Sequence, residues 1–142
     1  MKSFEGRSLE VALIISCAAL YALAITATAP IPTPWGVRHF RPGIVVPALF
    51  AVISTPRIAG LGAAIGTFVG SFILSLFGLS NPILSLISGV PGNFIGFYML
   101  GYLLSRYRSW GSFIVSSFTS LFIGNFIAAS GVMAYFSFIM PS

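Results

Sequence analysis

Residues 58–105 read IAGLGAAIGTFVGSFILSLFGLSNPILSLISGVPGNFIGFYMLGYLLS, and none of them is Asp, Glu, Lys or Arg. A membrane-spanning helix needs roughly 20 apolar residues, so this stretch has room for two spans and a turn. Residues 109–142 form a second stretch without these charges and have room for one span more. Because helices of soluble domains carry a polar face, the two stretches predict an all-α, polytopic helical membrane bundle.

The composition of the whole chain agrees with this class. Of its 142 residues, 57% are hydrophobic and 6% are charged, whereas soluble domains are about 25% charged. The mixed-charge start, MKSFEGRSLE, and the long apolar run after it differ from a cleaved signal peptide. The net charge of +5 is scattered among loops, which argues against nucleic acid as a partner. The single Cys17 is expected to be a small buried side chain without a disulfide.

We predict one transmembrane domain over residues 1–142, with five spans at about 9–29, 43–56, 58–77, 83–104 and 112–139. The apolar part of the second span, residues 44–55, contains Pro47 and is short, so it either crosses as a kinked span or re-enters. Basic residues favour crossing, because they prefer the cytoplasmic side. If residues 44–55 cross the membrane and the N-terminus is cytoplasmic, five basic residues lie inside and two lie outside. If residues 44–55 do not cross, two lie inside and five lie outside. We therefore expect a cell-membrane protein with its N-terminus in the cytoplasm.

Small residues recur every four positions in three of the predicted spans. Such ladders let helix backbones approach closely in lipid, where van der Waals packing replaces the hydrophobic drive. Ser116, Ser120 and Ala128 belong to the ladder of the last span. The glycines predicted to pack helices are Gly62, Gly66, Gly70, Gly92, Gly96 and Gly124.

The segment WGVRHFRPG, residues 35–43, gathers rare polar side chains in the predicted outer loop. Trp35, Arg38, His39 and Arg41 are open to two interpretations. They are anchors among lipid headgroups, or they form a lid that recognises a ligand, since the arginine fork suits carboxylate and phosphate. A catalytic His39 is disfavoured, because no Asp or Glu is predicted on that side to orient it.

Asn93 and Asn125 lie near the middle of neighbouring spans. An amide in hydrocarbon is costly unless it is hydrogen-bonded. The two residues either bond between helices or line a polar cavity together with Asn81 and Tyr98. Pro91 slightly favours a cavity, because a broken helix exposes backbone groups.

No catalytic constellation is visible, so we expect no enzyme and no cofactor or metal in this chain. Glu5 and Glu10 both lie at the N-terminus, and there is no Cys/His cluster or nucleotide-binding lysine loop. No acidic residue is embedded in a span, as ion-coupled transporters usually need. If the chain takes part in transport, its energy comes from another chain.

The order of four segments resembles the substrate-binding S components of energy-coupling factor (ECF) vitamin transporters. The segments are CAALYAL (17–23), VRHFRPGIVVPALFAVIST (37–55), AGLGAAIGTFVGSF (59–72) and SGVPGNFIGFYMLGYL (88–103). The resemblance covers residues 10–130 and is closest to archaeal-type or uncharacterised members. It implies capture of a water-soluble vitamin-like ligand from outside, followed by docking on a membrane coupling subunit and two cytoplasmic ATPases. ATP is then expected only on those ATPases.

The resemblance also implies roles for individual residues. Ala18 and Ala22 match the small residues, four apart, that dock on the coupling subunit; the other interpretation is ordinary packing. Members usually have six spans, so either the last helix is missing here or a short one is uncounted. The alternative function is a non-transport membrane assembly or scaffold subunit. The residues we expect to bind substrate are Trp35, Arg38, His39, Arg41, Asn81, Asn93, Tyr98 and Asn125.

Overall fold

A computed structural model describes residues 2–31, 34 and 41–140, and these residues form helices with no strand among them. Four helical stretches are long and apolar enough to cross a membrane: Glu5–Thr28, Pro56–Ser75, Pro82–Arg106 and Trp110–Ile139. The predicted all-α helical bundle is confirmed, and these stretches fit a multi-pass membrane protein.

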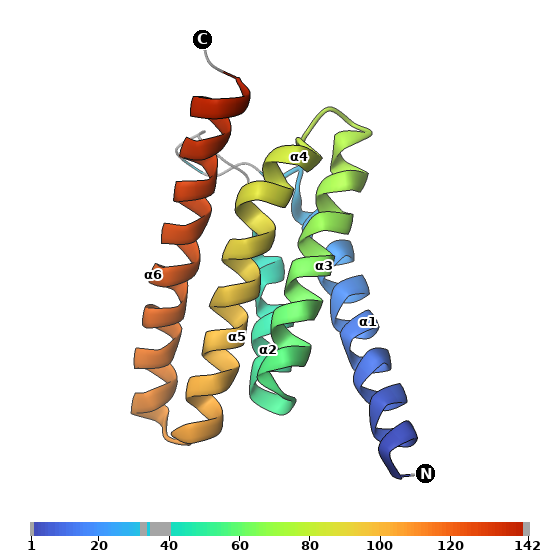
Figure 1. The fold of residues 1–142 in the computed structure, drawn as a ribbon, viewed down its shortest axis with the longest axis vertical. Coiled ribbons are helices and arrows are strands. Elements are labelled where there is room, and N and C mark those ends of the chain that lie inside the picture. Colours follow the sequence, from blue (N-terminus) through green and yellow to red (C-terminus); the bar gives the residue numbers. More distant parts are fainter. Residues whose placement is uncertain (1, 32–33, 35–40, 141–142) are drawn as a thin grey trace.

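The chain runs along the bundle in alternating directions, and its two termini lie at opposite ends (Figure 1). Helix α1 (Lys2–Thr28) leads away from the N-terminal end, and a 3-10 turn, η1 (Pro42–Ile44), with α2 (Val45–Ile53) leads back. Helix α3 (Pro56–Ser75) leads away again. Next come α4 (Pro82–Leu84), a π-helical turn η2 (Ser85–Gly89), and α5 (Val90–Arg106). Helix α6 (Trp110–Ala134) and a second π-turn, η3 (Tyr135–Ile139), end the fold.

The residues at helix starts explain where the chain turns. Thr55 caps α3 by accepting a hydrogen bond from the Ile58 amide at 3.4 Å, and Pro56 follows it at the first helical position. Asn81 caps α4, again before a proline, and Ser109 caps α6. A capping oxygen satisfies an otherwise free amide, and proline suits the first turn because it has no amide hydrogen to satisfy.

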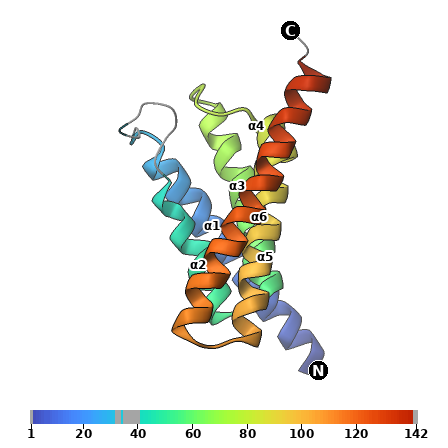
Figure 2. The same ribbon diagram turned by 90° about the vertical axis from the view of Figure 1, so that its left-hand side faces the viewer.

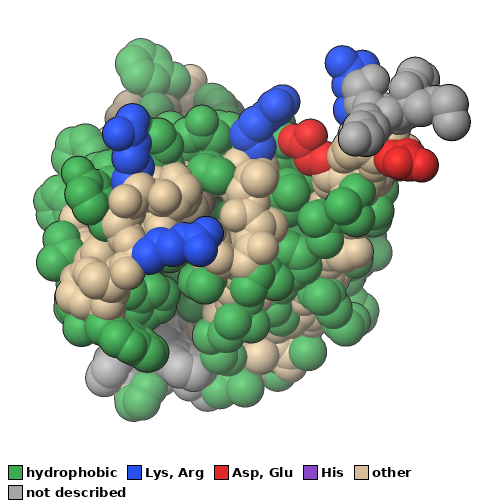
Figure 3. Space-filling view, turned by 90° about the horizontal axis from the view of Figure 1, so that it is seen from below, with side chains coloured by type: hydrophobic (Ala, Val, Ile, Leu, Met, Phe, Trp, Pro, Cys, Tyr) green, Lys and Arg blue, Asp and Glu red, His purple; other side chains and the backbone are tan. Residues whose placement is uncertain are grey.

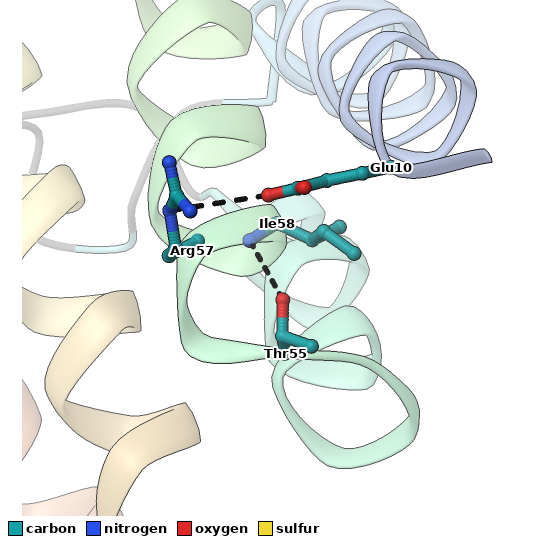
Figure 4. A network of polar contacts seen from close by, with 4 residues as sticks. All are labelled: Glu10, Thr55, Arg57 and Ile58. Atoms are coloured by element: carbon teal, nitrogen blue, oxygen red, sulfur yellow. Dashed lines mark hydrogen bonds and ion pairs between the residues drawn. The ribbon is translucent and has the colours of Figure 1, made fainter. Parts of the chain in front are cut away.

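The second predicted span is a short helix rather than a full-length one. The apolar helix Pro42–Ile53 has 12 residues, which at 1.5 Å per residue reach about 18 Å, against a hydrocarbon core of about 30 Å. It still returns the chain to the N-terminal end, because Arg57 Nε lies 3.9 Å from the Glu10 carboxylate of α1 (Figure 4).

Most of the charged side chains that the structure describes lie at this one end. Figure 3, seen from below, shows basic and acidic side chains spread over the face that includes the N-terminal turns of α1. The residues concerned are Glu5, Arg7, Glu10, Arg57, Arg106 and Arg108, while Arg41 lies at the start of η1, toward the other end.

Helix α3 is the centre of the bundle and packs on both α1 and α5. Its Ala59 and Ala63 are fully buried, and the core around them includes Tyr21, Phe97 and Leu100. Helix α6 lies obliquely over α5 and packs mainly on α5 and η2 (Figure 2). Much of its surface is therefore free to contact lipid.

The predicted packing glycines all lie at helix contacts. A Cβ atom on Gly62 would lie 2.6 Å from Cys17 of α1, and one on Gly66 would lie 2.9 Å from the Ala18 carbonyl oxygen. A Cβ atom on Gly70 would lie 3.3 Å from the Ile25 side chain. Between α5 and α6, Gly92 and Gly124 face each other, and Gly96 faces the Ser120 carbonyl. At these places the helices are closer than a larger side chain allows.

Replacing Gly66 with alanine tests this packing. The new methyl group would collide with the backbone of α1, so we expect the Gly66→Ala variant to lose about 1–3 kcal/mol of stability. The control is Gly111→Ala, because nothing lies within 4 Å of a Cβ there. Thermal unfolding in detergent is the measurement, and equal melting temperatures for the two variants would contradict the packing described.

Candidate functional site

A cavity of about 740 Å³ has many polar residues in its lining, and we call it the polar cavity. It extends from the α4 end of the bundle past the middle of α5 and α6, as far as Leu100 and Ser120. Of the described residues that precede α3, Arg41 and Ile44 reach its lining. The lining residues with polar side chains are Arg41, Thr67, Ser71, Ser80, Asn81, Ser85, Ser88, Asn93, Ser120 and Asn125.

Asn93 is held by α3 at the cavity wall. Its Nδ2 donates to Thr67 Oγ1 at 2.7 Å, and the Thr67 hydroxyl in turn donates to the Ala63 carbonyl at 2.7 Å. Thr67 is 2% exposed, so this chain of bonds is shielded. It fixes the carboxamide of Asn93 and leaves its Oδ1 as an acceptor for other partners. Both interpretations of Asn93 therefore apply at once: it bonds between helices and it lines the cavity.

Asn125 bonds only within its own helix among the described contacts. Its Nδ2 donates to the Leu121 carbonyl at 2.8 Å, and the residue is exposed on α6, where it lines the polar cavity. A carboxamide near the middle of a span is costly in hydrocarbon. Its position on the cavity side gives it polar surroundings instead.

Ser120 lines the same cavity, but its hydroxyl oxygen is buried rather than open to that space. The residue is 3% exposed, and its Oγ has no hydrogen-bond partner among the described residues. A buried polar atom without a partner destabilises a protein by about 1–3 kcal/mol. Neighbouring hydroxyls differ, since Ser71 donates to Ser85 at 2.8 Å and Ser88 donates to the Leu84 carbonyl at 2.7 Å. Ser120 is thus an unpartnered hydroxyl within the packed wall of the cavity, and not an exposed binding group.

Asn81 lines the cavity but is already engaged. Its Oδ1 accepts from the amides of Ile83 and Leu84, and its Nδ2 donates to the Tyr135 hydroxyl at 3.0 Å. These bonds cap α4 and tie it to the end of α6. Its main role in this structure is to shape the rim of the cavity.

Tyr98 does not line the polar cavity, so its predicted place there is corrected. It stacks on Phe94, with ring centroids 5.9 Å apart, and lines a separate hollow at the N-terminal end. Helix geometry explains the difference. Tyr98 follows Asn93 by five positions, and at 3.6 residues per turn this rotates its side chain well away from the face of Asn93.

The predicted docking pair is corrected as well. Ala18 and Ala22 are 6% and 4% exposed, and Ala18 packs on Gly66 of the central helix. Neither methyl group is available on the surface for another subunit. The small residues of α1 that match the motif serve the packing of α1 on α3.

Three predicted residues of the outer loop, Trp35, Arg38 and His39, lie outside the described residues. Arg41, from the same loop, lines the polar cavity. Among the residues that the structure describes, it is the one charged side chain in the lining. The two carboxylate side chains of the sequence, Glu5 and Glu10, belong to the N-terminal turns of α1, so neither neutralises it.

Sequence analysis missed the hydroxyl groups that line much of the cavity. Serine and threonine in a span usually bond to their own helix, so their presence carried no signal. Ser120 was assigned to a packing ladder with Gly124 and Ala128. All three also line the cavity, because small side chains leave the space that a ligand needs.

A scan against protein-family models found no match for this chain, and searches of the curated proteins and of the solved structures found none either.

The unsatisfied hydroxyl of Ser120 gives a test of the cavity in its empty state. We expect Ser120→Ala to raise the stability of the ligand-free protein by about 1 kcal/mol, because it removes a buried group without a partner. Ser88→Ala is the matched control and is expected to have the opposite or no effect, since its hydroxyl is bonded. Thermal unfolding in detergent measures both; a loss of stability in Ser120→Ala would show that the hydroxyl has a partner in the empty protein.

Proposed function

We propose that the chain is the membrane-embedded, ligand-binding subunit of an ATP-driven importer of the ECF type, and that it captures a small vitamin-like molecule from outside. The observation that carries the proposal is the polar cavity inside an otherwise apolar bundle. Pockets for small molecules combine apolar walls with a few placed polar groups. A bundle built only for assembly has no need of such a space.

The lining favours a neutral or anionic ligand over a cation. Arg41 supplies a positive charge, and neither of the two carboxylate side chains in the sequence is near enough to offset it. Asn93 and Asn125 offer uncharged hydrogen-bonding groups. A ligand with an anionic or carbonyl-rich end toward Arg41 meets these conditions, since guanidinium binds carboxylate and phosphate oxygens in pairs.

The energy source in this proposal lies in partner chains. The sequence has one lysine, Lys2, and no phosphate-binding loop around it, and its spans contain no acidic residue to couple ion flow. A membrane coupling subunit and two cytoplasmic ATPases supply the motor, in keeping with the resemblance in segment order. Ala18 and Ala22 are buried, so docking uses another part of the surface.

The proposal places the N-terminal end in the cytoplasm of a cell membrane. In support of this, basic residues gather at that end (Figure 3), and cytoplasmic loops are enriched in them. The polar cavity then begins at the outer end of the bundle, at Ser80 and Asn81, where it is reached from outside.

Cysteine labelling tests this orientation. In a Cys17→Ala background, a Phe77→Cys variant is expected to react with a membrane-impermeant maleimide in intact cells. A Tyr107→Cys variant, at the other end of the bundle, is expected to react only after the cells are opened. Both positions are well exposed; the reverse pattern would overturn the orientation.

Affinity purification of the full-length chain from its host's membranes, in mild detergent, tests the function. We expect a membrane subunit and two ATPases among the retained proteins, and a small molecule released on denaturation. An Ala129→Phe variant is expected to lose the small molecule and keep the proteins, because Ala129 is exposed to the cavity that it lines.

The matched control is Ala134→Phe, which is also exposed on α6 but lies outside the cavity lining. It is expected to keep both the small molecule and the partner proteins. Retention of other membrane proteins, with no ATPase and no small molecule, would favour the scaffold function instead.

A further inference from the structure

A second hollow opens at the N-terminal end of the bundle, and we call it the N-terminal groove. Its volume is about 580 Å³. The first turns of α1 form one side, and the corner where α2 leads into α3 forms the other. The lining residues are Gly6, Leu9, Glu10, Leu13, Ile53, Ser54, Thr55, Pro56, Arg57, Ile58 and Tyr98.

The walls of the N-terminal groove are mainly hydrocarbon. Leu9 and Ile53, on opposite sides, are 62% and 74% exposed, and the half-buried Leu13 adds further aliphatic surface, whereas Ile58 in the lining is buried. Exposed apolar surface of this kind marks contact with lipid or with a partner. Four helical stretches of this chain are long and apolar enough to span a bilayer, and the groove lies at the ends of two of them, Glu5–Thr28 and Pro56–Ser75. In a bilayer this is the level of the headgroups, where basic side chains and apolar surface both meet lipid.

The rim of the groove carries a loose ion pair. Arg57 Nε lies 3.9 Å from Glu10 Oε1, which is beyond hydrogen-bond length (Figure 4). The Arg57 side chain is 71% exposed, and that of Glu10 is 33% exposed. Exposed pairs of this kind are weak. The guanidinium therefore retains donors that suit a phosphate, and Glu10 competes with such a phosphate for it.

The surrounding face has an excess of positive charge. Figure 3 shows basic side chains spread over this end, and the described ones are Arg7, Arg57, Arg106 and Arg108, against Glu5 and Glu10. Anionic lipids are attracted to basic residues next to membrane spans. The apolar walls suit the acyl chain of any phospholipid, and the positive charge favours phospholipids with an anionic headgroup.

We propose that the N-terminal groove binds one anionic phospholipid. Its phosphate lies on Arg57 in place of Glu10, and an acyl chain lies between Leu9 and Leu13 on one side and Ile53 on the other. A lipid is favoured over a partner helix as the occupant, because the excess of arginines on this face complements an anionic headgroup. This site is independent of the polar cavity and of the proposed function.

The test is native mass spectrometry of the full chain, released from mixed micelles that contain equal amounts of phosphatidylglycerol and phosphatidylcholine. The wild-type protein is expected to retain phosphatidylglycerol about fivefold better, the preference that one basic residue gives at a membrane surface. Inorganic phosphate in the buffer is expected not to compete, because it lacks the acyl chain.

Two substitutions at the rim are expected to act in opposite directions. Arg57→Gln removes the phosphate contact and is expected to abolish the preference. Glu10→Gln removes the competitor and is expected to strengthen the preference about twofold, in line with the modest strength of an exposed ion pair. Arg108→Gln is the control, because it removes the same charge from the same face but lies outside the groove lining.

Three results would overturn the site. Equal retention of the two lipids by the wild-type protein would show no selection. Equal losses in Arg57→Gln and Arg108→Gln would show that the charge of the face acts as a whole. A loss in Glu10→Gln, with melting temperatures unchanged, would show that the acid supports lipid binding rather than competing with it.

Discussion

The close approach of α3 to α1 is the contact on which the rest of this structure depends. Gly62, Gly66 and Gly70 present a face without side chains, and against it lie the backbone of α1 and the side chains of Cys17, Tyr21 and Ile25. In lipid this packing supplies stability that the hydrophobic effect supplies in water. Helix α3 also packs on α5, so it joins α1 to the rest of the bundle. The buried Ala18 and Ala22 belong to this contact, and their role follows from it.

The polar cavity lies where α3, α5 and α6 leave space between them. Helix α6 packs mainly on α5 and η2. Small residues on α5 and α6 keep those two helices close, yet leave space beside them. Polar side chains of the lining bond to one another, as Asn93 does with Thr67, or to backbone carbonyls, as Asn125 does with Leu121. Ser120 differs, because its buried hydroxyl has no partner among the described residues.

The two ends of the bundle differ in chemistry. One end carries most of the charge and an apolar groove, while the polar cavity, with Arg41 in its lining, begins at the other end. This separation suits a chain that meets a ligand on one side of a membrane and lipid headgroups or partner subunits on the other. It also means that the two hollows can be altered by mutation independently of each other.

The sequence by itself determined the class, the helix positions and the return of the chain through residues 44–55. Long uncharged stretches, proline and capping signals and the distribution of arginines are local features, and membrane thickness and backbone capping act on them directly. Only the tertiary structure decided which faces meet. Tyr98 and Asn93 lie on one helix but face different hollows, and a motif of small residues on α1 does not say whether it packs inside the chain or outside it. Likewise, the free hydroxyl of Ser120 depends on what its neighbours leave unbonded. These outcomes depend on the rotation and tilt of whole helices, which result from all their contacts together and are not encoded in any one segment.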